Sequence, residues 1–364
     1  MKKIDWYILK KYLVTFFFCL LLFTVIAVVI DISEKTDDFV KSKLPVHRII
    51  TDYYFGFIPR IDALLFPLFV FIAVIYFTSR LAARSEVIAI LSSGVSFTRF
   101  MLPYFGGGLL LSAMLWGGYR YIVPNANKKW GAFQAQYIDP NFGAEYKDQI
   151  TLKNFYFRMD SNTYVGIRNY DTVRKKGDGF FIDQFSGTRL VYNLRAQNFN
   201  WDTAEKKWNL TNVLERHING KLEKNKSSAA MLVSYNFKPN DLRRDEYIKD
   251  QLPTPELDQF IKVERERGSE MLSTLLVEKY NRDAIPVSVF ILTVIGASMS
   301  SRKIRGGSGL QILIGLVLSC FYILFSRFSL VFATKGNFTP LLAAWVPNII
   351  FGMIAIYLFR RASR

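Results

Sequence analysis

The chain has 364 residues, of which 51% are hydrophobic and 21% are charged, a balance typical of a protein that is part membrane-embedded and part soluble. Its formal net charge of +17 raises the question of nucleic-acid binding, yet residues 125–283 hold 26 Lys and Arg against 22 Asp and Glu, a net charge of only +4. The excess of positive charge lies beside apolar segments, where membrane topology and anionic lipid explain it, so the sequence predicts no nucleic-acid partner.

Six uncharged runs are long enough to cross ~30 Å of hydrocarbon as helices. The first run is too long for the apolar core of a signal peptide and lacks a small-residue cleavage site, so it is predicted to be a span. The second span is expected to begin earlier than its uncharged run, near Tyr53, with Arg60 and Asp62 in its first turns. The runs cover residues 12–30, 63–79, 100–119, 284–301, 306–326 and 336–359.

The flanks on one side of these spans are strongly basic. Together they hold 13 Lys and Arg against two acids, Asp5 and Glu86, whereas the short loops on the other side mix both signs. By the positive-inside rule both termini are predicted to be cytoplasmic. Residues 32–50, about 125–280 and 332–340 are then predicted to lie outside.

The cytoplasmic loop between the second and third spans is unusually patterned. Residues 80–97 contain Arg84 and Glu86, followed by Val87, Ile88, Ile90 and Leu91, which are apolar at helical spacing. This spacing predicts a short amphipathic helix. Such a helix docks in a groove of another protein or lies in the membrane interface, and periodicity alone does not separate these two roles.

The external region is predicted to be mostly β-structure. Residues 150–236 are rich in β-branched and aromatic residues, with turn signals such as Asn219-Gly220, which favours an antiparallel sandwich, jelly roll or open barrel at about 145–238. Alternating residues such as Phe181 and Tyr192 are predicted to face inward, towards an ordinary core or an apolar groove. A helical linker at about 254–275, which begins at Thr254-Pro255, leads into the fourth span.

The sequence carries no pattern typical of an active site or a metal site. Cys19 and Cys320, the only two cysteines, fall in predicted spans, so no disulfide is expected in the external region. His47 and His217 are isolated, and no nucleotide-binding loop is present. The glycine run 106–108 indicates close helix packing. No catalytic residue, metal ligand or bound cofactor is therefore predicted in this chain.

Ionisable side chains at membrane depth are candidates for function. Arg60 and Arg120 lie near outer span ends, where their charged groups reach water easily. Arg327 lies further inside the fifth span, so it is predicted to contact an anionic substrate, to bind a partner within the chain, or to extend towards the interface.

Through several short motifs, the sequence resembles the LptF/LptG (YjgP/YjgQ) permease family of the lipopolysaccharide exporter over essentially the whole chain. Arg84-Ser85-Glu86 followed by Gly94 is similar to the family's loop signature. The order and spacing of the other motifs add specificity. These motifs are Pro59-Arg60 with Phe66-Pro67, Pro124-Asn125, "RDAIP" from Arg282 to Pro286, and "GNFTPLLAAWVPNIIF" near the C-terminus.

The resemblance implies a fold and an assembly. The fold is membrane α-helical, with six transmembrane helices and an inserted periplasmic all-β jelly-roll-like domain. Two such permeases pair, bind an LptB-type ATPase dimer that binds the ATP, and pass lipopolysaccharide to LptC/LptA-type periplasmic bridge proteins. The expected organisation is spans one to three in 1–124, a periplasmic region in 125–275 and spans four to six in 276–364, in the inner membrane of a Gram-negative cell.

The resemblance also assigns residues. The loop helix becomes a coupling helix, which receives the motion of the ATPase. The family further predicts basic residues at the outer end of span one, where Lys35 and Lys41 follow Asp31 and Glu34. The predicted ATPase contacts are Arg84, Ser85, Glu86, Val87, Ile90, Leu91 and Gly94, and the predicted lipid contacts are Lys35, Lys41, Arg60, Arg120 and Arg327.

Two other functions remain open at this point. One is a different ABC-type permease, for lipids or lipoproteins, although that kind typically has four spans with the external domain after the first. The other is a membrane-anchored periplasmic scaffold, which would need neither six spans nor a patterned cytoplasmic helix. Within the resembled family, the overall pattern favours a G-type over an F-type subunit.

Overall fold

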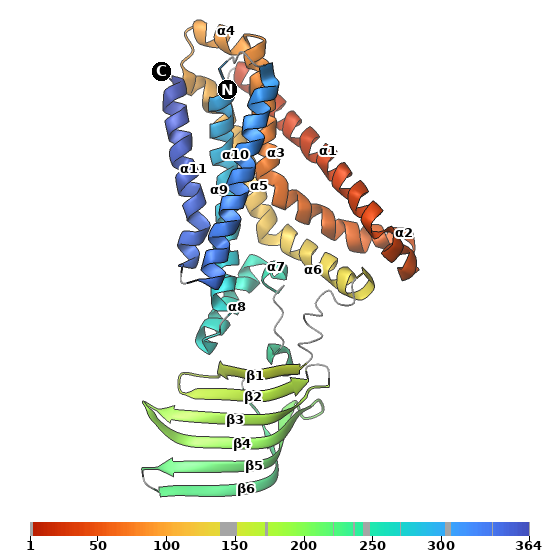
Figure 1. The fold of residues 1–364 in the computed structure, drawn as a ribbon, viewed down its shortest axis with the longest axis vertical. Coiled ribbons are helices and arrows are strands. Elements are labelled where there is room, and N and C mark those ends of the chain that lie inside the picture. Colours follow the sequence, from red (N-terminus) through yellow and green to blue (C-terminus); the bar gives the residue numbers. More distant parts are fainter. Residues whose placement is uncertain are drawn as a thin grey trace. The chain divides into compact units, whose positions relative to one another are not determined.

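The computed structural model forms two compact units (Figure 1). One contains Met1–Phe133, Lys249–Leu257 and Ser273–Arg364, and the other contains Gln134–Ile248 and Asp258–Leu272. The start of the predicted β-domain, residues 145–150, lies outside the described residues. The structure describes residues 3–138, 151–171, 174–220, 222–235, 237–242, 248–269, 271–302, 307–336 and 338–363.

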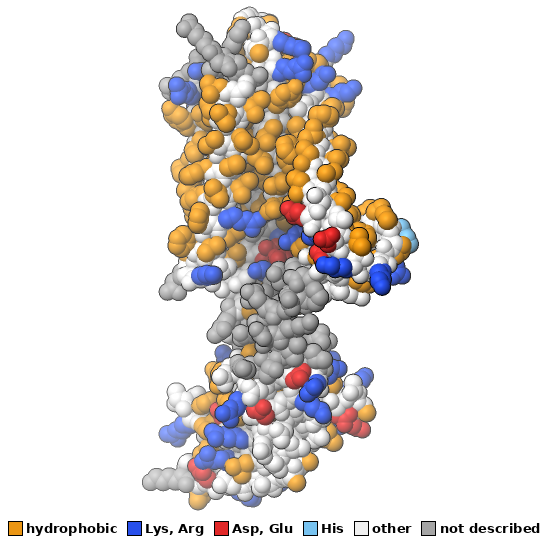
Figure 2. All heavy atoms as spheres, turned by 45° about the vertical axis from the view of Figure 1, so that its right-hand side comes forward, with side chains coloured by type: hydrophobic (Ala, Val, Ile, Leu, Met, Phe, Trp, Pro, Cys, Tyr) orange, Lys and Arg blue, Asp and Glu red, His pale blue; other side chains and the backbone are white. Residues whose placement is uncertain are grey.

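The first unit is helical and confirms the six predicted spans. Within the described ranges, six helical segments are long and apolar enough to cross a membrane. The face shown in Figure 2 is covered by hydrophobic side chains over the helices, and Lys and Arg gather at the end that carries the termini. The six segments are Lys3–Ser42, Val46–Ala83, Phe97–Ile138, Leu272–Ser300, Ile312–Lys335 and Pro340–Ser363.

Two of these segments are built from several pieces. The second joins a helical turn, α2, through a π-helical turn to α3, and the third continues from α5 through a π-helical turn to α6. The other spans are single helices. The bounds are α1 Lys3–Ser42, α2 Val46–Arg48, α3 Phe55–Ala83, α5 Phe97–Gly117, α6 Val123–Phe133, α9 Leu272–Ser300, α10 Gly307–Lys335 and α11 Pro340–Ser363.

The glycine run in α5 brings three helices close together, as predicted. A Cβ atom on Gly107 would lie 2.6 Å from Tyr12 of α1, and one on Gly108 would lie 3.1 Å from Thr293 of α9. The Tyr12 and Thr293 hydroxyls are themselves hydrogen-bonded at 3.1 Å in the buried core. The two glycines therefore let α1 and α9 approach α5 from different directions and meet each other.

A buried amide links the last three spans. Asn348 of α11, 3% exposed, donates to the Ala284 carbonyl of α9 at 2.7 Å and accepts from the Tyr322 hydroxyl of α10 at 2.8 Å. Pro286 lies inside α9 next to this point, and its carbonyl accepts a hydrogen bond from the Ser112 hydroxyl at 2.5 Å. Polar side chains of α5 and α11 thus bind backbone carbonyls of α9 close to a proline within a membrane helix.

The second unit contains one six-stranded antiparallel sheet, which confirms the inserted all-β domain. The spatial order β1-β2-β3-β4-β5-β6 is the order along the chain, so the described strands form a single open meander rather than two facing sheets. The bounds are β1 Thr151–Arg158, β2 Thr163–Asp171, β3 Lys176–Ser186, β4 Arg189–Asp202, β5 Lys207–Asn219 and β6 Leu222–Val233.

One face of the sheet is filled by the chain's own aromatic residues. Trp208 is 1% exposed and donates its indole N–H to the Phe237 carbonyl at 3.0 Å, so the segment after β6 covers this face. Tyr192 packs against the same core. The prediction for Phe181 was wrong: its ring lies on the opposite face, over Gly166 of the neighbouring strand, while Phe180 is the buried residue.

Two short helices follow the sheet along the chain. They are α7 Ile248–Gln251 and α8 Thr254–Arg267. The expected helix start at Thr254-Pro255 is confirmed. The predicted linker is not one helix, because α8 ends at Arg267 and α9, which forms the fourth span, begins at Leu272.

Candidate functional site

The predicted coupling segment forms α4, Glu86–Ser92, between α3 and α5. It lies at the same end of the helical unit as both termini (Figure 1). Ser85 precedes α4 with φ at +60°, and Gly94 follows it with φ at +88°. Left-handed backbone at both ends turns the chain sharply, and glycine adopts this conformation without strain.

The apolar side of α4 packs against its own bundle. Val87 is 1% exposed, and Ile90 and Leu91 pack against the same buried cluster. In this structure Val87 is therefore not free for a partner, whereas Ile90 and Leu91 are only partly buried. The physical reason is that a two-turn helix buries its apolar side against the nearest apolar surface, which here belongs to α3 and α5.

The outward side of α4 is what remains available. Ile88 is 51% exposed, Arg84, Ser85 and Gly94 are exposed, and Glu86 is half-buried. Arg84 and Glu86 lie 3.9 Å apart and line an open hollow of about 240 Å³. Its other lining residues are Tyr7, Lys11, Val14, Thr15, Tyr76, Phe77, Arg80 and Leu81.

An ion pair missed by the sequence reasoning fixes the base of this segment. Arg99, at the start of α5, contacts Asp5 of α1 at 2.6 Å, and Asp5 is 5% exposed. The pair ties the chain's first helix to the helix that follows the coupling segment. One signal was present in the sequence, because Asp5 is one of only two acids in the basic flanks.

At the opposite end of the spans, the predicted lipid contact Lys35 is bound within the chain. It pairs with Asp31 at 3.1 Å, donates to the Tyr53 hydroxyl, and lies 4.9 Å from the centre of the Tyr53 ring. Tyr53 and Tyr54 also donate to the buried Asp31 carboxylate, at 3.0 and 3.1 Å. Asp31 is thus the acid that holds this cluster together.

The other predicted lipid contacts fall into two groups. Arg60 and Arg120 lie against aromatic rings, with the Arg60 guanidinium 3.8 Å from the centre of the Trp130 ring and that of Arg120 5.1 Å from Trp116. Lys41 and Arg327 are exposed, and the Lys41 ammonium lies 4.0 Å from Asp38. The structure therefore leaves Lys41 and Arg327 more accessible than Arg60, Arg120 and Lys35.

Arg327 lines a hollow of about 270 Å³ that also contains Lys249 and two acids, Asp250 and Glu278. Burial raises the pKa of Asp250 to about 6, and the neighbouring Glu278 carboxylate adds to this effect. The hollow therefore combines both signs of charge, so the arginine has acids close by within its own chain. Its remaining lining residues are Thr274, Val277, Asn281, Leu330, Val331 and Thr334.

Arg282, in the motif that opens span four, connects two of the segments that line this hollow. Arg282 is 3% exposed, donates to Glu278 at 2.8 Å, and donates to the backbone carbonyls of Lys249 and Leu252 at 2.6 and 2.7 Å. A single buried guanidinium thus positions α7 against α9. The sequence marked this motif only through the resemblance, and its role is a contact within the chain.

These features define a polytopic membrane protein with an inserted β-domain, in which the short helix α4 lies at the end of the helical unit that carries the termini. The comparisons specify the class further. The model of the family "Lipopolysaccharide export system permease LptF/LptG" matches residues 6–361, so the chain belongs to this family of inner-membrane, multi-pass permeases. The chain is 23% identical over 317 residues to lipopolysaccharide export system permease protein LptG of Escherichia coli K12, covering 84% of each chain, and LptG of E. coli O6:H1 gives the same figures.

Proposed function

We propose that this chain is a permease subunit of an ATP-driven transporter that extracts lipopolysaccharide from the membrane. The chain itself binds no nucleotide, and a separate subunit supplies the motion. A separate LptB-type ATPase dimer binds ATP and closes. A second LptF/LptG-type permease pairs with this chain in the membrane. Lipopolysaccharide leaves the outer leaflet of the inner membrane, passes the β-domain, and reaches LptC/LptA-type bridge proteins in the periplasm.

The observation that carries this proposal is the two-sided packing of α4. Val87 fixes the inner side of α4 in the bundle core, and the outer side presents Ile88 with Arg84 at one end. Because packed interiors transmit displacement rather than absorb it, a partner that pushes on Ile88 moves α3 and α5 with α4. A helix that only rested in the membrane interface would not need a buried anchor.

The opposite end of the spans supplies the lipid side of the proposal. Lys41 and Arg327 are the exposed cations among the predicted lipid contacts, and phosphate groups of lipopolysaccharide would bind them through charge-assisted hydrogen bonds. Arg327 then lies in the periplasmic half of the membrane, Lys41 lies on the periplasmic side of it, and the β-domain lies in the periplasm.

The open sheet supplies the proposed contact to the bridge. The first and last strands, β1 and β6, each pair on one side only, so each offers a free edge within the described sheet. An added strand from another β-domain would bind such an edge through main-chain hydrogen bonds. The C-terminal half of β6, Ser227 to Val233, is uncharged and suits such pairing better than the N-terminal half, which contains lysines.

A substitution on the outer side of α4 tests the proposal. Ile88→Glu replaces an exposed apolar residue by a charge, so the fold should survive while the apolar contact to an ATPase is lost. We expect copurification of the nucleotide-binding subunit to fall at least tenfold, as the loss of one buried aliphatic contact costs about 1.5–3 kcal/mol. Glu86→Lys should act in the same direction.

Lys10→Gln is the matched control, because Lys10 is exposed on α1 outside α4. It should leave ATPase association unchanged. If Ile88→Glu also retains the ATPase and full transport, α4 is not the coupling helix. If no nucleotide-binding subunit copurifies even with the wild type, the chain acts instead as a periplasmic scaffold or with different machinery.

A further inference from the structure

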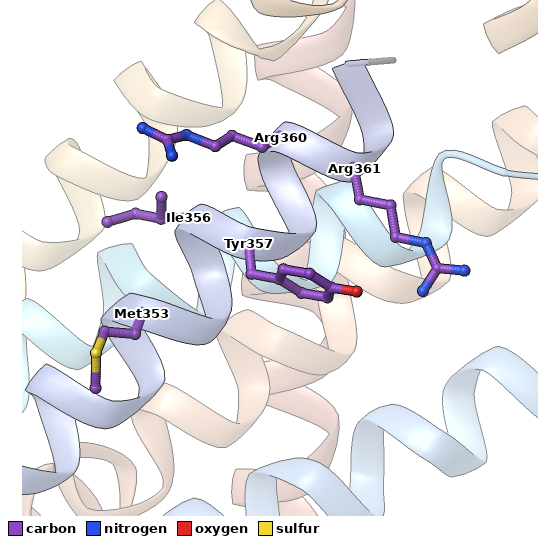
Figure 3. A pocket seen from close by; sticks show the side chains of 5 residues that line it. All are labelled: Met353, Ile356, Tyr357, Arg360 and Arg361. Carbon is purple, nitrogen blue, oxygen red and sulfur yellow. The ribbon is translucent and has the colours of Figure 1, made fainter.

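Two adjoining hollows on α11 share the residues Ile356 and Arg360. One is an apolar slot of about 420 Å³ between α5, α9 and α11. The other, of about 540 Å³, is lined by Met353, Tyr357 and Arg361 in addition to the shared pair (Figure 3). An apolar compartment therefore continues directly into a cationic one along a single helix.

The slot has aromatic walls and a floor of small residues. Phe105 of α5 stands 5.9 Å, between ring centres, from both Phe290 of α9 and Phe359 of α11. Gly352 and Ala355 leave the space between these rings open, since a Cβ atom on Gly352 would come no closer than 4.0 Å to Ile291. Such a slot suits a flexible hydrocarbon chain better than a polar ligand.

The cationic compartment contains two arginines in succession. Arg360 and Arg361 are both exposed, and no acidic side chain in the part of the chain that the structure describes forms an ion pair with either. In Figure 3, Arg360 points to the same side of α11 as Ile356 and Met353, and Arg361 points to the other side with Tyr357. The two guanidinium groups thus flank the helix just beyond its apolar residues.

The spacing matches a phospholipid. Gly352 and Arg360 are separated by eight residues, or ~12 Å along a helix, which is close to the ~15 Å thickness of one hydrocarbon leaflet. An acyl chain in the slot would therefore place its phosphate beside Arg360. A peptide segment would bring backbone polar groups into a slot whose walls offer them no partner.

We propose that this groove binds one anionic glycerophospholipid from the leaflet on the side of the chain termini. The acyl chain occupies the slot between α5, α9 and α11, and the phosphate binds Arg360, the arginine that lines both hollows. The lipid is a constituent of the bilayer and not the transported cargo. The assignment is independent of the proposed function, because none of the residues named for this groove belongs to α4 or lines the Arg327 hollow.

Lipid retention tests this assignment. The full chain, with any subunits that copurify, is reconstituted into nanodiscs of equal parts phosphatidylglycerol and phosphatidylcholine, and native mass spectrometry counts the lipids that it retains. The wild type should retain phosphatidylglycerol preferentially. Gly352→Met should fill the slot and abolish retention of this lipid, while Gly106→Met, on an exposed part of α5 with open space around it, should not.

The arginines test the headgroup separately. Arg360→Gln should lower the ratio of retained phosphatidylglycerol to phosphatidylcholine about fivefold, since a cation near the surface contributes about 1 kcal/mol. Arg361→Gln, on the other side of α11, should lower this ratio less. Lys10→Gln should leave the ratio unchanged. Equal retention of both lipids by the wild type would overturn the assignment, and so would full retention in Gly352→Met or displacement of the lipid by lipopolysaccharide or a copurifying protein.

Discussion

At the scale of single residues, most of the buried polar groups singled out above serve the chain itself. Arg282, Asp31 and Asn348 each make several hydrogen bonds or ion pairs inside the protein. Each lies in or beside a predicted span, where an unsatisfied polar group is costly. A rare polar residue in a membrane helix is thus explained here by its internal partners before any substrate is considered.

Asp250 is the exception, because its environment disfavours its charge. Burial, together with the Glu278 carboxylate, raises its pKa to about 6, so the folded chain binds this proton more tightly than the unfolded chain does. The stability of the wild type should therefore fall as the pH rises through the interval up to about 6. Asp250→Asn removes the titration and should increase stability at pH 8 by up to about 3 kcal/mol, at about 1.4 kcal/mol per pKa unit.

Thermal unfolding of the wild type and Asp250→Asn, each measured at pH 5 and pH 8, checks this expectation. The variant's advantage should be clearly larger at pH 8. Asp37→Asn, at an exposed acid on α1, is the control. An advantage of equal size at both pH values would show that the surroundings of Asp250 do not raise its pKa.

The direction of individual side chains was the part that the sequence predicted least well. Helical spacing correctly grouped Val87, Ile90 and Leu91, but it did not show whether their common side faced a partner or their own bundle. In the sheet, alternation placed Phe181 on the wrong face because a period of two has no absolute phase. Lys35 was predicted to meet lipid, and the sequence reasoning did not foresee that it also pairs with Asp31 and Tyr53 within the chain.

At the scale of elements, the glycines of α5 give a direct test of helix packing. Gly107→Ala would place a methyl group 2.6 Å from the Tyr12 ring, which must force α1 outward and disturb the bond between Tyr12 and Thr293. Overpacking of this kind costs about 1–3 kcal/mol. The midpoint of thermal unfolding in detergent should fall for this variant.

Gly106→Ala is the matched comparison one residue earlier. Nothing lies within 4 Å of the added Cβ, so this variant should be neutral or more stable by up to about 1 kcal/mol, from improved helix propensity alone. Opposite signs at two adjacent glycines would establish that α1 packs on the Gly107 side of α5. A similar loss of stability in both variants would contradict this packing.

The existence of most elements could be predicted, and their boundaries only in part. Hydrophobic length alone identified the six spans, because a membrane helix has a fixed minimum length. Strand boundaries were harder to predict than strand content, and the last strand, β6, runs from Leu222 to Val233. Its first half is polar, with Glu223, Lys224 and Lys226, and an edge strand tolerates such residues without any alternating pattern.

At the scale of the whole molecule, charge predicts an orientation that labelling can check. After Cys19 and Cys320 are replaced by Ala, Ser93→Cys and Ser161→Cys provide single exposed thiols in the α4 region and in the turn between β1 and β2. In cells whose outer membrane alone is permeabilised, an impermeant maleimide should label Ser161→Cys. Ser93→Cys should react only after lysis, and early labelling there would reverse the assigned topology.

The meander order of the sheet has a further consequence, for folding. Because β1 to β6 pair only with neighbours in sequence, the domain can grow hairpin by hairpin as the chain is synthesised. Local pairing lowers contact order, which speeds folding and shortens the time for which aromatic strands are exposed. The sheet can therefore be complete before α9, α10 and α11 are synthesised, and only the helical bundle must wait for the end of the chain.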